Sequence, residues 1–193
     1  MKKMGVLLAL SLVVLGGFSA RAESLIELRA GAGLVGSNPD DLNDKLQGSG
    51  MDFSSVDNYN LDVFFNLPLI GLGVRNEWLN DKQSGSGQDL EINVNNLTLL
   101  ADLRLLDNDL FYIGPIVGIG YPWGDIKGSG GKVSLDKSQF SYSLAGEAGV
   151  KLGRFILAAE AGYSSLVLDT EDDTAKVDLS GFYGKVMVGI GIF

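Results

Sequence analysis

Side chains able to do covalent or redox chemistry are scarce in this chain of 193 residues, which contains no histidine and no cysteine. A Ser-His-Asp triad, a cysteine nucleophile, a disulfide and a thiolate metal site are therefore excluded. A pair of carboxylates working as acid and base stays open, with Glu147 and Glu160 as the candidates. We predict instead that both carboxylates pair with basic side chains and that the protein is not an enzyme.

Metal and cofactor sites are also poorly supported. Without histidine and cysteine, a metal site would consist of oxygen ligands, and the acidic runs at residues 40–44 and 169–173 lack the spacing of an EF-hand loop. The segment at residues 128–132 is glycine-rich and ends in lysine, but Ile126 replaces the first glycine of a phosphate loop and Val133 replaces its Ser/Thr. We predict no metal centre and no cofactor.

The first 22 residues are typical of a secretory signal. Lys2 and Lys3 precede an apolar run at residues 6–18, and the Ala20-Arg21-Ala22 segment fits a cleavage site. Cleavage after Ala22 leaves one domain at residues 23–193, with 24 acidic and 12 basic residues because Lys2, Lys3 and Arg21 are removed from the 15 bases. This balance of −12 argues against nucleic acid as a partner, and no later apolar stretch is long enough for a transmembrane helix.

The rest of the chain alternates apolar and small or polar residues with a period of two. The clearest run lies at residues 111–121, where Phe111, Ile113, Val117 and Tyr121 share one face. This period predicts β-strands with two different faces. We expect eight strands, at residues 24–36, 58–67, 70–78, 89–106, 111–121, 138–152, 155–168 and 177–193.

The connections alternate between short turns and long polar loops. Turns are expected at Pro68, at residues 107–109 and at Gly153-Arg154, and loops at residues 37–57, 80–88, 122–136 and 169–176. Both ends of the predicted domain fall on the short-turn side. This organisation predicts an all-β fold, an eight-stranded antiparallel up-and-down transmembrane β-barrel.

The two faces of the strands differ in charge and in aromatic content. The polar face carries six acids and five bases, which we predict to form a charge network in the lumen: Glu27, Arg29, Asp62, Arg75, Glu77, Asp102, Arg104, Glu147, Lys151, Glu160 and Lys185. Glycines also gather on the polar face, where they leave room for long side chains. The aromatic residues at the strand ends predict two girdles at the membrane interfaces: Tyr59, Phe65, Trp78, Phe111, Tyr121, Trp123, Tyr142, Phe155 and Tyr163.

The fourth strand changes phase along its length. Leu97, Leu99 and Leu103 lie on one face, whereas Leu90 and Ile92 lie on the other. Either a bulge intervenes, or the strand rises above the membrane and its outward residues become polar. Within the lumen, we predict that Arg75 or Arg104 pairs with Asp102 or Glu77, and that Lys185 meets Glu27 across the closing seam.

Behind an export signal, this pattern resembles the small bacterial outer-membrane barrels typified by the OmpA membrane domain, OmpX and OmpW. The resemblance implies residence in the outer membrane, contact with outer-membrane lipid and lipopolysaccharide, and recognition by the barrel-assembly machinery through a C-terminal strand ending in Phe193. The resemblance also implies that the protein is a monomer. The known enzymes among such barrels depend on a histidine, which this chain lacks, so the resemblance does not suggest an enzyme. The acidic loops are expected to be solvated, with weak Ca²⁺ or Mg²⁺ bridging to lipopolysaccharide as an alternative.

Three functions are compatible with these features. The main hypothesis is a non-enzymatic barrel with a lumen filled by charged side chains and acidic surface loops, serving the envelope or a surface interaction. The first alternative is OmpW-like passage or binding of small hydrophobic molecules, supported by Phe64, Leu90, Ile92 and Val94. The second is a periplasmic, lipocalin-like barrel with the opposite orientation of its faces.

Overall fold

The computed structural model describes residues 25–37, 55–85, 88–128, 131–135, 137–138, 140–169 and 176–192. Among these residues there is no helix, and hence none that is long and apolar enough to cross a membrane. The predicted signal segment, the terminal Phe193 and the acidic run at residues 40–44 lie outside the described residues, as does most of the run at residues 169–173.

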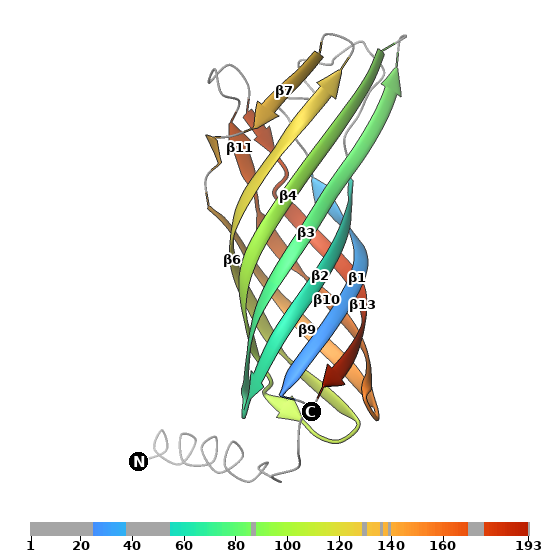
Figure 1. Ribbon diagram of the computed structural model, residues 1–193, viewed down its shortest axis with the longest axis vertical. Helices are drawn as coiled ribbons and strands as arrows, with labels where there is room; N and C mark the ends of the chain where they lie inside the picture. The colour runs from blue at the N-terminus through green and yellow to red at the C-terminus, as the bar shows by residue number, and fades with distance from the viewer. Residues whose placement is uncertain are drawn as a thin grey trace, which may run out of the picture.

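Eight long strands form the wall of a closed barrel (Figure 1). They are β1 Ile26–Ser37, β2 Val56–Leu67, β3 Ile70–Gly85, β4 Gln88–Leu103, β6 Phe111–Gly128, β9 Ser141–Leu152, β10 Phe155–Ser165 and β13 Gly181–Ile192. Each pairs antiparallel with its neighbours, and two pairings complete the circle: β1 with β13, and β4 with β6. The predicted eight-stranded antiparallel barrel is confirmed.

Short strands extend this wall. After the end of β4, β5 Leu106–Asp107 continues the pairing with β6. At the other end of β6, β7 Gly131–Leu135 pairs with its last residues. A separate three-stranded sheet contains β8 Lys137–Ser138, β11 Val167–Asp169 and β12 Lys176–Asp178. We call the end with the short turns, at the bottom of Figure 1, the lower end of the barrel.

The lower turns follow the predicted pattern. Leu67 pairs with Ile70, and Leu152 pairs with Phe155, so each of these turns has two residues. Gly153 has φ 67°, a left-handed conformation that glycine adopts without steric cost. The third turn is held by Asn108, whose Oδ1 accepts hydrogen bonds from the backbone N–H groups of Leu110 and Phe111.

The upper connections differ from the prediction in two places. The stretch at residues 80–88 was expected to be a loop, but β3 and β4 remain paired as far as Gly85 and Gln88. Similarly, the stretch predicted as a loop at residues 122–136 contains the upper part of β6 and all of β7. Gly and Ser are enriched in both stretches and usually indicate loops. In the second stretch the strands continue where Leu135 and Ile126 join a buried apolar core, whereas the first stretch extends the pairing of β3 with β4 beyond Leu79 and Ile92 of the same core.

This apolar core fills the upper part of the barrel and explains the phase change of β4. Over its paired residues, the register of β4 with both β3 and β6 is continuous, so no bulge intervenes. Ile92 and Val94 point inward, like Asn96 and Asp102 lower on the strand, and are almost fully buried. The buried apolar residues toward this end, which we call the apolar cap, are Val35, Val56, Leu79, Ile92, Val94, Leu135, Leu166, Leu168, Val177 and Leu179.

The apolar cap has a measurable consequence for stability. We expect Ile92→Ala to lower the free energy of unfolding by about 2–5 kcal/mol, because it leaves a cavity among fully buried neighbours. Lys127→Ala, on the exposed outer face of the same region, should cost less than about 1 kcal/mol because its ion pairs are exposed to solvent. Urea unfolding in lipid vesicles, followed by tryptophan fluorescence, measures both values. Equal losses for the two variants would mean that the upper strands are not packed as a core.

Candidate functional site

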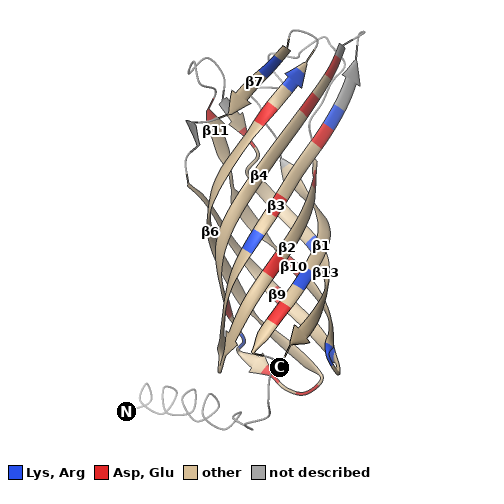
Figure 2. Cartoon of the chain, in the orientation of Figure 1, with Lys and Arg blue, Asp and Glu red and all other residues tan. Residues whose placement is uncertain are grey.

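Charged side chains line the interior of the lower barrel. They come from seven of the eight long strands, all except β6, and from the residues that follow β4. Figure 2 shows the positions of the charged residues along the strands. Of the eleven charged residues predicted to face the lumen, Glu77 and Lys151 are partly buried. The other nine are almost fully buried: Glu27, Arg29, Asp62, Arg75, Asp102, Arg104, Glu147, Glu160 and Lys185. They divide into two groups of ion pairs.

The lower cluster is organised by Arg29 and Arg104. Arg29 donates through Nε to Glu27 at 2.5 Å and through Nη1 to Glu147 at 2.6 Å. Arg104 donates through Nε to Asp102 at 3.0 Å and through Nη2 to the second oxygen of Glu27 at 2.9 Å. Glu27 therefore joins the two guanidinium groups into one network, and each bond is a charge-assisted hydrogen bond.

Aromatic rings enclose the lower cluster. The Tyr112 hydroxyl donates to Glu147 at 2.6 Å, and the Arg104 guanidinium lies 4.5 Å from the centre of the Tyr112 ring. The Arg29 guanidinium lies 4.4 Å from the centre of the Phe64 ring. Lys151 pairs with Asp107 at the lower rim. Neither Tyr112 nor Asp107 was predicted, although Tyr112 lies on the inward phase of its strand and an inward aromatic among charges is the signal that would have identified it.

The upper cluster is organised by Arg75. Its guanidinium makes two hydrogen bonds to Asp62, both 2.9 Å long, and two to Glu160, at 2.9 and 2.7 Å. The Tyr183 hydroxyl donates to Glu160 at 2.6 Å, and Lys185 donates to Glu77 at 2.8 Å. A guanidinium between two carboxylates, each held by two bonds, has little freedom to move and spans the lumen from β3 to β10.

Of the two predicted pairings, the first is confirmed through Arg104 and the second is wrong. Arg104 does pair with Asp102, but Arg75 pairs with Asp62 and Glu160 instead of Asp102 or Glu77. Lys185 does not meet Glu27, although their strands are neighbours. In the register, Glu27 lies opposite Gly191, six positions along β13 from Lys185, and at about 3.3 Å per residue this separates the two by about 20 Å. Strand adjacency was predicted correctly, but the register was not.

Glycines on the inner face make room for the large side chains. A Cβ at residue 149 would lie 2.3 Å from Cε1 of Tyr112, and one at residue 73 would lie 2.7 Å from Cδ1 of Phe64. The rings therefore occupy space that any other residue would fill. This close approach accounts for the enrichment of glycine on the polar face.

Glu147 and Glu160, the candidates for a carboxylate mechanism, lie directly opposite each other on β9 and β10. Glu147 is held by Arg29 and Tyr112, and Glu160 by Arg75 and Tyr183. Both are almost fully buried, so a substrate would have to displace these partners to reach them. Among the described residues, no group of three or more acidic side chains is arranged to hold a metal ion.

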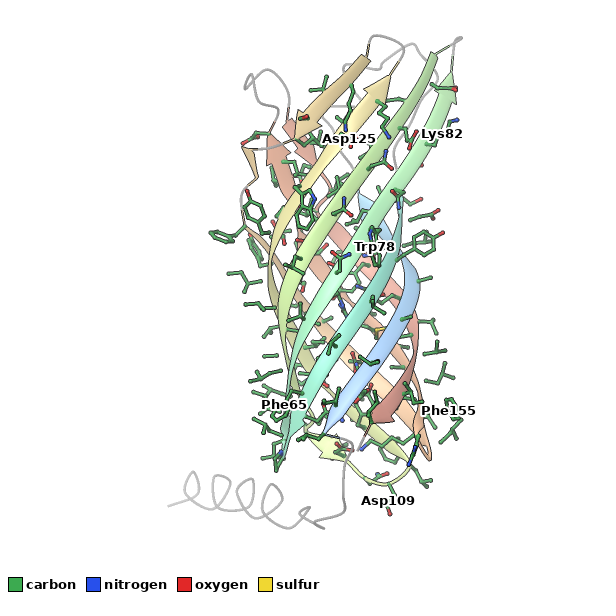
Figure 3. All side chains as sticks on the ribbon, in the orientation of Figure 1. Phe65, Trp78, Lys82, Asp109, Asp125 and Phe155 are labelled. Atoms are coloured by element: carbon green, nitrogen blue, oxygen red, sulfur yellow. The ribbon has the colours of Figure 1, made fainter. Side chains whose placement is uncertain are left out.

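The outer face is apolar over the same height at which the lumen is charged. Leu99, Leu144 and Val188 are each 62% exposed. Phe65 and Phe155 lie at the lower end of this band and Trp78 lies near its upper end, with Lys82 and Asp125 above it (Figure 3). Two further exposed aromatic residues were not predicted: Phe140 packs against Tyr121, and Phe182 packs against Tyr163.

No protein-family profile matches the chain, and no curated protein matches it. Among solved structures, the crystal structure of Neisserial surface protein A is similar, with 12% sequence identity, a TM-score of 0.58, and coverage of 89% of this chain and 100% of that chain. Two crystal structures of Ail, the attachment invasion locus protein of Yersinia pestis, also match over 86% of this chain and 94% of theirs. The first has 16% identity and a TM-score of 0.44, and the second, a complex with the heparin analogue sucrose octasulfate, has 19% and 0.45. The chain therefore has the fold of the small eight-stranded outer-membrane barrels.

The upper cluster around Arg75, which we also call the Arg75 layer, leads to a prediction about the stability of the barrel. Arg75→Met should lower the free energy of unfolding by about 3–5 kcal/mol, because it leaves the carboxylates of Asp62 and Glu160 buried without their partner. Combining it with Asp62→Asn and Glu160→Gln should recover most of the loss, since the buried charges are then removed together. Urea titration in lipid vesicles gives both values, with Arg154→Met in an exposed turn as the control. A loss below about 0.5 kcal/mol for Arg75→Met would contradict the role assigned to this layer.

Proposed function

We propose that this protein is a non-enzymatic integral protein of the bacterial outer membrane, whose sealed barrel holds its upper strands and loops at the cell surface. The observation that carries this proposal is the reversal of polarity along the same strands. In the lower barrel the outer face is apolar and the inner face is charged, whereas in the upper barrel the inner face is apolar. A protein bathed in water throughout has no need for the first arrangement, and a lipid environment requires it.

The height of the apolar band supports the assignment. On β6, the outward aromatic residues Phe111 and Tyr121 mark its two ends, ten positions apart. Ten residues at about 3.3 Å, tilted by about 40°, span about 25 Å, which matches the apolar band of outer-membrane barrels. Above this band, the outward residues of the same sheet include charged side chains that form ion pairs through exposed lysines, such as Lys132 with Asp125 and Lys82 with Asp89.

A sealed lumen supports a role outside the barrel. Two layers fill the interior from the lower end to the upper end. The first consists of guanidinium groups paired with carboxylates, and the second is the apolar cap. The alternative of OmpW-like passage depends on the inward apolar residues of β4, but Ile92 and Val94 pack fully into the cap. A periplasmic lipocalin-like barrel would turn its apolar face inward over its whole length, and the exposed lower band opposes this.

Cysteine labelling tests the location and orientation, because the chain has no native cysteine. Lys82→Cys places a thiol on the exposed upper strands, and Asp109→Cys places one in a lower turn. A maleimide too large to pass porins should label Lys82→Cys in intact cells, and should label Asp109→Cys only after lysis. Leu99→Cys, in the apolar band, should resist the reagent in both conditions and react only after unfolding. The opposite result would be that none of the three variants is labelled in intact cells and that Leu99→Cys reacts after lysis. That result would indicate a soluble periplasmic barrel.

Electrical recording tests the sealed lumen. In planar lipid bilayers the purified protein should produce no stable channel, because both the Arg75 layer and the apolar cap block the path of ions. Insertion is verified separately by the resistance of the apolar band to labelling. Reproducible conductance steps from inserted protein would show that a water-filled path exists and would favour a transport function.

A further inference from the structure

A small cavity separates the upper cluster from the apolar cap. Its volume is about 20 Å³, enough for one water-sized occupant. Leu79 and Leu166 of the cap contribute to its wall, and Tyr142 lines it as well. The remaining lining residues are polar: Asn58, Glu77, Asn96, Thr98, Ser141, Ser143, Ser164 and Tyr183.

Two of the polar residues that line this cavity are incompletely bonded. Asn58 Oδ1 and Thr98 Oγ1 are buried and have no hydrogen-bond partner among the described residues, and the two residues are only 4% and 3% exposed. A buried polar atom without a partner is costly, so native structures nearly always provide one. Because an amide oxygen is only an acceptor, whatever sits beside Asn58 Oδ1 must be positively charged or must donate a hydrogen bond.

The two side-chain amides beside the cavity are bonded to Glu77. The Nδ2 atoms of Asn58 and Asn96 donate to the two oxygens of Glu77, at 3.3 and 3.0 Å. Ser141 Oγ donates to Asn96 Oδ1 at 2.9 Å. Three side-chain oxygens converge at Gly120: two of them, Asn96 Oδ1 and Ser141 Oγ, are bonded to each other, and the third, Thr98 Oγ1, has no partner among the described residues. Asn96 Oδ1, Thr98 Oγ1 and Ser141 Oγ each lie 2.6 Å from the position that a Cβ at residue 120 would occupy.

The adjoining upper cluster carries one excess negative charge. Asp62, Glu77 and Glu160 contribute three carboxylates, while Arg75 and Lys185 contribute two positive charges. Lys185 is already bonded to Glu77, the carboxylate that lines the cavity. An excess charge in a lumen surrounded by an apolar band and covered by an apolar cap is poorly solvated, so compensation by a nearby positive charge is favourable.

We propose that this cavity binds one small monovalent cation of the sodium class, held by Glu77, Asn58, Thr98 and the oxygens around Gly120. Carboxylate, amide and hydroxyl oxygens are ligands for hard cations. The single excess negative charge matches a cation with one positive charge. In addition, Glu77 is the one carboxylate among the cavity's lining residues, and divalent cations usually bind more carboxylates than one. The site is separate from the surface role proposed above, and it would lock the upper cluster beneath the cap.

The experiment compares thermal unfolding of the full-length mature protein after it has been folded into neutral detergent in sodium chloride or in N-methylglucamine chloride, at equal ionic strength and pH. Folding in each salt lets the cation bind before the cap closes over the cavity. The large organic cation cannot enter a cavity of about 20 Å³. For the wild type, we expect sodium to raise the midpoint by about 2–4 °C once its concentration exceeds the dissociation constant by about fivefold. The rise should saturate with sodium concentration, which distinguishes binding from general screening.

Two variants and one control make the test specific. Gly120→Ala places a methyl group among the three oxygens, and Thr98→Val removes one oxygen with little change of shape, so both should abolish the sodium-specific rise. Thr98→Val serves if Gly120→Ala fails to fold. Gly146→Ala, where a Cβ would meet nothing within 4 Å, should keep the full effect.

Two results would overturn the proposal. Equal midpoints in both salts, at every pH tested, would mean that the cavity holds water. Equal midpoints in both salts that shift together with pH would mean that a proton on a carboxyl of the cluster balances the charge.

Discussion

The ion pairs between guanidinium groups and carboxylates inside the barrel are the interactions on which the rest of the structure depends. A closed barrel of eight strands has an interior only wide enough for side chains, so every charge placed there must find a partner within it. Arg29, Arg75 and Arg104 meet this requirement by bonding to carboxylates from several different strands. Each of the eight long strands contributes a side chain to these contacts or to the rings around them: Glu27, Asp62, Arg75, Asp102, Tyr112, Glu147, Glu160 and Lys185. The ion pairs therefore act as cross-links through the centre of the barrel, in addition to the hydrogen bonds of its wall.

Above the apolar band, the polarity of the two faces of the same strands is reversed. There the outside is expected to face water, so the inside is free to be apolar and the barrel ends in a packed core. No bulge is needed along β4 for this reversal, because the inward positions simply change from Asn96 and Thr98 to Val94 and Ile92. The small sheet of β8, β11 and β12 contributes Leu168 and Val177 to this core. One continuous wall is thus built for two different surroundings.

Sequence reasoning predicted the barrel correctly because period-two alternation is a local property that each strand displays by itself. The phase of every long strand, and hence which charges face inward, could be read from residues such as Arg75 and Glu160. The pairings could not be read in the same way, since a pairing depends on the register between strands and on their tilt. The neighbouring strands of Lys185 and Glu27 illustrate this, because six positions of register separate two residues that adjacency alone would bring together. The extent of β3 and β6 was also underestimated, because glycine and serine indicate loops locally whereas the apolar cap is a tertiary feature.

The double closure of the lumen determines where a function can reside. A ligand entering from above would have to open the apolar cap, and one crossing the lumen would also have to break the four hydrogen bonds of Arg75. Breaking either layer exposes buried apolar surface or leaves buried charges unpaired, and both are costly compared with the binding energy of a small ligand. Among the described residues, charged surface is accessible instead on the outer faces of the tall strands β3, β4 and β6, where Lys82, Glu91 and Lys127 lie above the apolar band. A barrel closed in this way is suited to hold a rigid surface in place, as the function proposed above requires.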